Sequence, residues 1–393
     1  MKKQEVFQSY KENIMPTYSK APLIFVKGKG SRLWDIQNRE YLDFFPGWGV
    51  GNLGHCHPKV VSAVREQISK LIFIPNNYYH IQQAKLAEEI VLRSYPAKVF
   101  FCNSGAEANE AAIKFSRKFG KGRCEIITFE NSFHGRTMAT VSATGQKKYQ
   151  EGFEPLVPGF KSVKFNDIDA VRNAVNEKTV AVMLELIQGE GGINVATKDF
   201  VLGLRMLCDE KNLLLIIDEV QTGIGRTGKL FAYQHYGMAP DILTLAKALG
   251  GGLPIGVMVV KKEIADILQP GMHASTFGGG PVVCRAALGV LEAIEKEKLL
   301  LNAQEKGAYL FEKLNLLKDK YPVIKEVRGL GLMIGVELNI SGKIIVEKCL
   351  EKGLLINCTH DTVLRLMPAL NITGREINAA LQILDEVLKE YSG

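Results

Sequence analysis

The 393-residue chain lacks several features that would place it in a specialised class of protein. It has no stretch that approaches the roughly 20 apolar residues needed to span a bilayer, so we expect no membrane-embedded part. The first residues, MKKQEVFQSYKENIM, are basic but include no apolar segment of the kind found in secretory signals. The seven cysteines are scattered and form no C-x-x-C pair, which favours reduced thiols in a cytoplasmic protein.

Runs of basic residues, internal repeats and low-complexity tracts are also missing. The formal net charge of +7 is spread along the chain and suits small carboxylate or phosphate ligands, so we expect no nucleic-acid partner. Phe44, Phe45 and Trp48 have no interleaved basic residues, which favours core or pocket lining over base stacking. His55 and His57 have no third ligand nearby, so we expect no metal site.

The middle of the chain alternates short apolar runs with helical patterns. This alternation predicts an α/β fold with a mostly parallel sheet and helices on both faces. Several expected strands are apolar at every position, as in strands that are buried on both sides. The expected strands are Lys98–Phe101, Glu125–Phe129, Ala181–Glu185, Leu213–Asp218, Ile242–Leu245 and Ile255–Val260, with helices over Ala106–Phe119 and Lys198–Lys211.

The two ends of the chain differ from this middle region. From about Gly289, helical patterns over Val290–Glu297 and Leu301–Tyr321 lead to shorter apolar runs and a final amphipathic helix. Near the start, LIFVKGKGSRLWD predicts a hairpin. Because the chain is too long for one ordinary core, we expect a large domain over residues 56–288. A small α+β domain is then built from residues 1–55 and 289–393.

The stretch LLLIIDEVQTGIGRTGKL raises a choice between two functions. Asp218 ends an apolar strand, as in an ATPase, and Gly223, Gly228 and Lys229 match the phosphate-loop pattern G-x-x-x-x-G-K. A phosphate loop, however, ends in Ser or Thr to hold magnesium, and here that position is Leu230. The loop also follows the acidic strand directly, whereas an ATPase puts the two on separate strands. An ATP-binding protein is therefore the distant alternative.

Ligands of open α/β sheets bind at the carboxyl edge of the strands, where Asp218 is expected to lie. Lys247 follows a neighbouring strand, where desolvation would lower its pKa and make the amine nucleophilic. The helix that begins at Gly105 would offer free N–H groups to an anion, and Phe133 would add an aromatic face. A carboxylate, a lysine, an anion cradle and an aromatic face are what pyridoxal phosphate requires.

The motifs NSGAEANEAAIK, SFHGRT, LELIQGEGG, IIDEVQTGIGRTGKLFA, TLAKALGGGLPIG, STFGG and LRLMPAL follow one another along the chain. In this set and order the chain resembles the class III aminotransferases, which have the aspartate aminotransferase fold of pyridoxal phosphate enzymes (fold type I). The resemblance runs from roughly Pro22 to the C-terminal helix and is strongest to the acetylornithine enzymes. It implies a homodimer that transfers the amino group of N2-acetyl-L-ornithine to 2-oxoglutarate in arginine biosynthesis.

The resemblance also implies roles for individual residues at the cofactor. Lys247 bonds to the cofactor aldehyde and later carries the proton, and Asp218 pairs with the pyridinium nitrogen. Val220 and Phe133 pack on the two faces of the ring, and Gln221 reaches the phenolic oxygen. The remaining cofactor contacts are Glu219, Gly105 and Ala106, the last two at the phosphate, and Thr276, which completes the phosphate site of the partner subunit.

At the substrate, the resemblance implies contacts with Ser275 and with Arg136, whose guanidinium suits a distal carboxylate. Glu190 and Arg365 match a switch, in which Arg365 binds the α-carboxylate of glutamate and Glu190 neutralises Arg365 when the donor presents only a terminal amine. A permanent surface ion pair of little worth is the alternative. Trp48 replaces the small or aliphatic residue expected there. Ornithine, succinylornithine, succinyl-diaminopimelate and 4-aminobutyrate therefore stay open as alternative donors.

Overall fold

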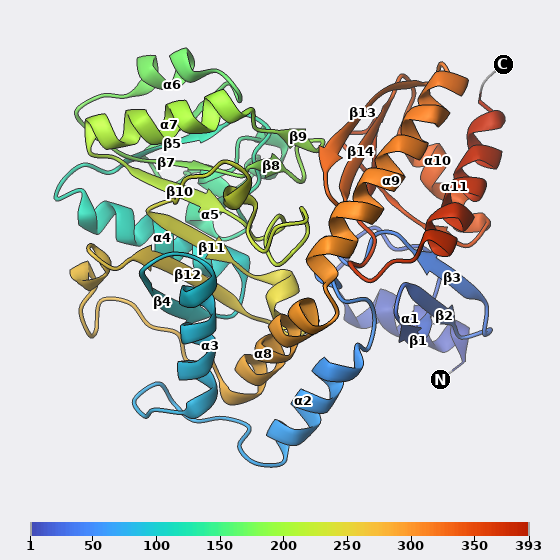
Figure 1. The fold of residues 1–393 in the computed structure, drawn as a ribbon, viewed down its shortest axis with the longest axis horizontal. Coiled ribbons are helices and arrows are strands. Elements are labelled where there is room, and N and C mark those ends of the chain that lie inside the picture. Colours follow the sequence, from blue (N-terminus) through green and yellow to red (C-terminus); the bar gives the residue numbers. More distant parts are fainter. Residues whose placement is uncertain (1, 392–393) are drawn as a thin grey trace.

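The computed structural model describes residues 2–391. Figure 1 shows a large part around a central sheet and a smaller part, on the right, that contains elements from both ends of the chain. The central sheet is 7-stranded, with the order β4-β12-β11-β10-β7-β5-β6. Its strands are β4 (Ala97–Cys102), β5 (Glu125–Phe129), β6 (Phe160–Val163), β7 (Thr179–Leu184), β10 (Leu214–Asp218), β11 (Ile242–Leu245) and β12 (Gly256–Lys261).

Successive side chains of a central strand point to opposite faces of the sheet, and each face is covered by a helix. Ile217 of β10 belongs to the apolar cluster that includes α7 (Lys198–Lys211). Its neighbour Ile216 belongs to a second cluster with α4 (Gly105–Phe119). Because both faces are buried, every position of β10 has to be apolar until the strand ends at Asp218. The prediction of helices on both faces of a buried sheet is confirmed.

The sheet is mostly parallel, as predicted. β10 runs parallel to β7 and β11, and β5 runs parallel to β7 and β6. β12 is antiparallel to both of its neighbours, β11 and β4. The carboxyl ends of β4, β5, β7, β10 and β11 therefore meet at one edge of the sheet. The edge strand β6 was not predicted, because FKSV is short and only partly buried.

The smaller part joins both ends of the chain. β15 (Leu354–Leu355) pairs in parallel with β3 (Glu40–Asp43), so that a late strand completes the 4-stranded sheet β1-β2-β3-β15. A second 4-stranded sheet has the order β13-β14-β17-β16. The other elements of this part are α1 (Lys3–Asn13), β1 (Phe25–Lys29), β2 (Arg32–Asp35), α9 (Leu299–Lys320), β13 (Ile324–Leu330), β14 (Met333–Leu338), α10 (Gly342–Glu351), β16 (Asn357–Thr359), β17 (Val363–Leu366) and α11 (Gly374–Lys389).

The predicted domain boundary at residues 288 and 289 falls inside a single helix, α8 (Pro281–Lys296). Pro281 occupies the first turn, where a missing N–H is tolerated. α8 packs against α2 (Pro58–Ile68) and α3 (Ile81–Arg93), as Figure 1 also shows. Within residues 2–391, no helix is both long and apolar enough to cross a membrane. The remaining elements are α5 (Met138–Ala143), α6 (Ile168–Ala174), β8 (Ile187–Gln188) and β9 (Asn194–Val195).

The glycine-rich loop after β10 joins the two parts of the molecule. The Arg226 side chain in this loop is fully buried, and its Nη1 donates to the carbonyl oxygens of Leu332 (2.9 Å) and Pro368 (2.5 Å). Its Nη2 donates to the side-chain oxygen of Asn52. The loop leads through turns to a short 3-10 helix, Ala232–His235, whereas a phosphate loop opens a longer helix. This geometry argues against the ATP-binding alternative.

Candidate active site

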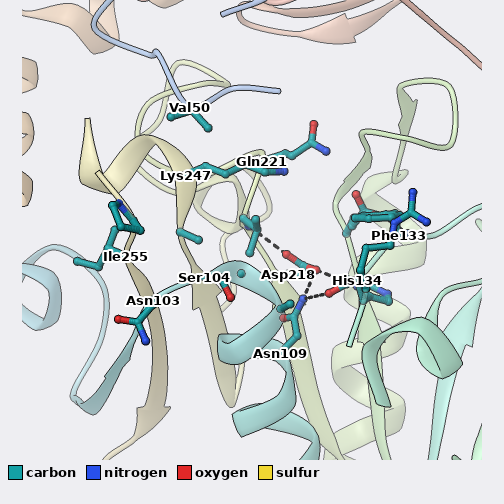
Figure 2. A pocket seen from close by; sticks show the side chains of 18 of the residues that line it. Val50, Asn103, Ser104, Asn109, Phe133, His134, Asp218, Gln221, Lys247 and Ile255 are labelled. Carbon is teal, nitrogen blue, oxygen red and sulfur yellow. Dashed lines mark hydrogen bonds and ion pairs between the residues drawn. The ribbon is translucent and has the colours of Figure 1, made fainter. Parts of the chain in front are cut away.

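A cavity of about 620 Å³ opens at the carboxyl edge of the central sheet (Figure 2). Its volume is in the range of small-molecule sites and leaves room for a cofactor beside a small substrate. The loops that follow β4, β5, β7, β10 and β11 all contribute to its wall. Most of the predicted cofactor residues line it: Gly105, Ala106, Phe133, Asp218, Val220, Gln221 and Lys247, together with the predicted substrate residue Arg136.

Three donors orient the Asp218 carboxylate at the end of β10. Asn109 Nδ2 and His134 Nδ1 each donate to Oδ2 at 2.8 Å, and the backbone N–H of Val220 donates to Oδ1 at 3.0 Å. Because an ionised carboxylate only accepts hydrogen bonds, the His134 proton resides on Nδ1. Asp218 is only 4% exposed. A carboxylate held in this way can pair with a protonated ring nitrogen in the cavity.

Lys247 lies directly after β11, at the start of the short 3-10 helix Lys247–Gly250. Its φ of 44° lies in the left-handed region, which residues with a side chain rarely adopt. Desolvation by the cavity wall lowers the pKa of Lys247 to about 8, although the nearby carboxylates of Glu190, Asp218 and Glu185 oppose the shift. Near neutral pH a fraction of the amine is therefore unprotonated and nucleophilic.

The start of α4 forms an anion cradle beside the lysine. The Ser104 hydroxyl caps the helix by accepting from the backbone N–H of Glu107 at 3.1 Å. The N–H groups of Gly105 and Ala106 make no hydrogen bond among residues 2–391, and both residues line the cavity. At Gly105 a Cβ atom would lie 2.7 Å from Val220 Cγ1, so only glycine fits. Free N–H groups at a helix N-terminus bind phosphate groups well.

The predicted switch residues Glu190 and Arg365 are not among the residues that line the cavity, and they form an ion pair with each other. Arg365 Nη1 lies 2.6 Å from Glu190 Oε1, and Gln221 Nε2 donates to the same oxygen at 3.1 Å. Burial opposes ionisation of Glu190, but the Arg365 guanidinium, the Gln221 hydrogen bond and the charge of Lys247 together outweigh it and lower the pKa of Glu190. Arg365 is 1% exposed, so the pair is not a surface ion pair. Gln221 lines the cavity and connects it to this pair.

Glu219 lies away from the cavity, although the resemblance implied a cofactor contact. Its carboxylate accepts from the backbone N–H groups of Ala232 (2.6 Å) and Tyr233 (2.8 Å). Burial raises the pKa of Glu219 to about 8. The adjacent Asp218 faces the cavity, because consecutive residues at a strand end point to opposite sides. Glu219 therefore organises the loop behind β10.

Ser275 and Thr276 also lie outside this cavity. The Ser275 hydroxyl accepts from Asn103 Nδ2 at 3.1 Å, and Asn103 itself lines the cavity wall. Thr276 is exposed on the same segment. Trp48, another predicted substrate residue, is 46% exposed and contacts Phe45 edge to face, with ring centroids 5.5 Å apart. Val50 from the loop of Trp48 does line the cavity (Figure 2).

Sequence reasoning missed several residues that line the cavity, among them Glu185, Asn109 and Tyr18. Glu185 accepts from the backbone N–H groups of Phe133 (2.8 Å) and Gly189 (3.1 Å), and burial raises the pKa of Glu185 to about 7. It follows an apolar strand, so the signal that identified Asp218 could have identified it too. Tyr18 lies in the N-terminal segment and is marked by no pattern of the sequence.

Comparison with known proteins gives consistent matches over nearly the whole chain. The family model described as "Aminotransferase class-III" matches residues 14–388. The acetylornithine aminotransferase of Methanocaldococcus jannaschii is 55% identical and covers 95% of each chain, and that of Caldanaerobacter subterraneus is 52% identical, covering 97% of this chain and 98% of its own.

Among solved structures, the ornithine aminotransferase of Toxoplasma gondii has a TM-score of 0.96 at 34% identity, covering 100% of this chain and 96% of its own. The acetylornithine aminotransferase of Elizabethkingia anophelis has a TM-score of 0.89 at 32% identity, covering 99% of this chain and 100% of its own. A second structure of the Toxoplasma gondii enzyme is described as having partial occupancy of pyridoxal phosphate at its active site.

Proposed function

The chain belongs to the class III aminotransferases, and on this basis we propose that it transfers the terminal amino group of N2-acetyl-L-ornithine to 2-oxoglutarate. The products are N-acetyl-L-glutamate 5-semialdehyde and L-glutamate, which places the reaction in arginine biosynthesis. The fold is that of fold type I pyridoxal phosphate enzymes, and the cofactor is pyridoxal phosphate. The proposed donor is supported by relatives that bear this activity in their names at 45 to 55% identity.

The cavity has the groups that pyridoxal phosphate needs. The unpaired N–H groups of Gly105 and Ala106 suit its phosphate, and the absence of a side chain at Gly105 leaves the space open next to Val220. Asp218 suits the ring nitrogen, and Lys247 suits the aldehyde. When bound, the cofactor supplies an electron-withdrawing ring that stabilises negative charge at the substrate carbon that loses its proton.

The protein's own residues supply the remaining chemistry. Lys247, with its lowered pKa, would hold the cofactor through the aldehyde and would take up a proton on Nζ from the substrate carbon. Asp218, fixed by Asn109 and His134, holds a negative charge at one place throughout both half-reactions. Such preorganised charge needs no reorientation during the reaction.

The Glu190–Arg365 ion pair is the observation that best supports a site for two different amino donors. Glutamate brings an α-carboxylate next to the reacting carbon, and Arg365 can bind it once Glu190 is displaced. N-acetylornithine brings no carboxylate there, so Glu190 stays paired with Arg365 and no buried cation is left alone. Arg136 in the cavity wall would bind the carboxylate at the far end of either donor.

We also propose that the active form is a homodimer in which Thr276 completes the phosphate site of the partner subunit. Large apolar side chains are exposed near this segment, namely Phe277 (66%), Phe73 (42%) and Tyr79 (102%). Such a patch suits burial against a second copy. Light scattering of the wild-type protein should give twice the chain mass, and Phe277→Glu should shift it towards the monomer and weaken cofactor retention.

The first test is a visible absorption spectrum of the purified protein, titrated with amino donors. We expect an absorption band of the bound cofactor that bleaches on addition of N-acetylornithine and returns with 2-oxoglutarate. Parallel titrations use ornithine, 4-aminobutyrate, succinylornithine and succinyl-diaminopimelate. Bleaching by one of these at much lower concentration would keep the reaction type and replace the proposed donor. The lack of any band after addition of pyridoxal phosphate would overturn the proposal.

A further inference from the structure

Arg136 is an arginine in the cavity wall that makes no hydrogen bond or ion pair to an acidic residue among residues 2–391. Its guanidinium instead contacts aromatic rings. The guanidinium carbon lies 4.1 Å from the ring centroid of Tyr149 and 5.4 Å from that of Phe133. The two rings contact each other edge to face, with centroids 5.5 Å apart. An exposed arginine with no acidic partner would sample many rotamers, so these rings are what holds it.

The turn that contains Tyr149 is fixed by hydrogen bonds from the glutamines on either side of it. Tyr149 ends a short 3-10 helix, Lys147–Tyr149, that lies between two glutamines. Gln146 Nε2 donates to the carbonyl oxygens of Asn131 and Ser132, both at 3.1 Å, in the loop that leads to Phe133. On the other side, Gln150 Nε2 donates to the carbonyl oxygen of Thr144 at 2.9 Å. The turn is thus tied to the backbone next to the cavity on both sides.

We propose that Tyr149 is a positioning residue for substrate binding, and that its ring holds the Arg136 guanidinium ready for the distal carboxylate of both amino donors. This inference rests on the proposed function only in the role of Arg136. A guanidinium stacked on an aromatic face keeps its N–H edges free for a bidentate carboxylate. An acidic partner would hold the arginine equally firmly but would occupy those same donors.

The contact of Tyr149 with Arg136 uses the ring and not the hydroxyl. The Tyr149 hydroxyl makes no hydrogen bond within residues 2–391. The ammonium group of Lys148 lies 4.9 Å from the same ring centroid, so a second cation adjoins the subsite. Both cations favour an anionic ligand at this end of the cavity. A phenylalanine at position 149 therefore retains the proposed role, whereas a leucine, which is apolar but has no π face, loses it.

The test compares Tyr149→Leu with Tyr149→Phe in the holoenzyme. In Tyr149→Leu, KM for glutamate and for 2-oxoglutarate should rise about tenfold, which corresponds to about 1.4 kcal/mol. Its kcat and its cofactor absorption band should stay within about twofold of wild type. Binding of the unreactive dicarboxylate glutarate, measured by calorimetry, should weaken by the same factor. In Tyr149→Phe, the KM values and the affinity for glutarate should be close to those of wild type.

A double-mutant cycle with Arg136→Ala separates positioning from a general structural effect. In the Arg136→Ala background, Tyr149→Leu should cause no further rise in KM and no further loss of glutarate binding. Equal losses in both backgrounds, or a Tyr149→Phe variant as impaired as Tyr149→Leu, would overturn the inference. Glutamate and 2-oxoglutarate take part in every candidate donor reaction, and glutarate only probes the carboxylate subsites, so this result does not depend on N-acetylornithine being the donor.

Discussion

The guanidinium of Arg365 is held by the Glu190 carboxylate and by two further groups. Its Nη1 donates to the Gly189 carbonyl oxygen at 2.7 Å, and its Nη2 donates to Asn357 Oδ1 at 2.8 Å. The guanidinium also lies over the ring of Phe45, 4.7 Å from the centroid. Glu190 is therefore not the only group that positions Arg365. The ion pair can open without releasing the arginine, as a switch between two donors requires.

Replacing Glu190 by Gln should affect the two donors in opposite directions. Without the carboxylate, Arg365 remains cationic and unpaired when N-acetylornithine binds, so kcat/KM for that donor should fall at least tenfold. The kcat/KM for glutamate should stay the same or rise, because no Glu190–Arg365 ion pair has to open before glutamate binds. Separate kinetics of the two half-reactions measure both values, and each serves as the control for the other. An equal fall in both would contradict the switch.

Reconstitution of the apoenzyme should depend on pH through Lys247. Burial lowers the pKa of this amine to about 8, and only its neutral form attacks the cofactor aldehyde. The rate of pyridoxal phosphate incorporation should therefore rise as the pH increases from 6 and should level off above about 8. Stopped-flow absorbance measures this rate. A rise that continues to pH 10, as for an ordinary lysine, would contradict the lowered pKa.

The stability of the fold should fall as the pH rises between about 4.5 and 8. Burial raises the pKa of Glu219 from 4.5 to about 8, so the folded state binds a proton that the unfolded state has released. The resulting stabilisation is fully present below pH 4.5 and is lost as the pH passes 8. Glu185, with a pKa raised to about 7, acts in the same direction. In urea unfolding at several pH values, the free energy of unfolding should decline less steeply with pH in Glu219→Gln than in wild type.

Replacements of Arg226 and Lys229, both in the glycine-rich loop, should differ sharply in their effect on stability. Arg226→Met removes the donors to three buried acceptor oxygens and should destabilise the protein by about 3 kcal/mol, near 1 kcal/mol for each lost hydrogen bond. Lys229 is three residues away and exposed. Lys229→Ala should change the free energy of unfolding by less than about 0.5 kcal/mol and transaminase activity by less than about twofold. Thermal unfolding and a standard activity assay measure both. Loss of transaminase activity in Lys229→Ala would contradict a purely structural role for this loop.

Trp48 should influence the choice between acylated and free ornithine. The Trp48 ring contacts Phe45, and the Phe45 ring lies under the Arg365 guanidinium. A different ring at position 48 should therefore shift Phe45 and, through it, Arg365. We expect Trp48→Tyr, which replaces the indole by a smaller ring with a hydroxyl, to raise kcat/KM for ornithine relative to N-acetylornithine about tenfold. Competition between the two donors in one reaction measures this ratio. An unchanged ratio would place the source of donor preference elsewhere in the cavity.

Much of this molecule could be predicted from the sequence for a simple physical reason. Strands buried on both faces are mostly apolar, so β7, β10 and β11 stand out as runs rich in Val, Ile and Leu. Polar residues that follow such runs lie at one edge when the strands are parallel. That reasoning placed Asp218 and Lys247 together at the cavity, although they are distant in the chain.

The short strand β6 and the true start of α8 were harder to predict, because their signals are weak or shared with loops. FKSV has too few buried residues to show a period, and PVVCRAAL reads equally as loop or helix until it packs against α2 and α3. Glu185 could have been found by the argument used for Asp218. Tyr18 could not, since nothing local marks a tyrosine in an exposed N-terminal segment as cavity lining.

The sequence by itself determined the α/β sheet, the edge at which ligands bind and the chemical groups gathered there, because these depend on local polarity and strand direction. Only the tertiary structure decided that Glu219, the neighbour of Asp218, faces away from the cavity, since neighbours in a strand point to opposite sides. It also decided that Arg226 bridges the two parts of the molecule and that Arg136 rests on Tyr149. Contacts of this kind join segments far apart in the chain, and no pattern within either segment specifies the other.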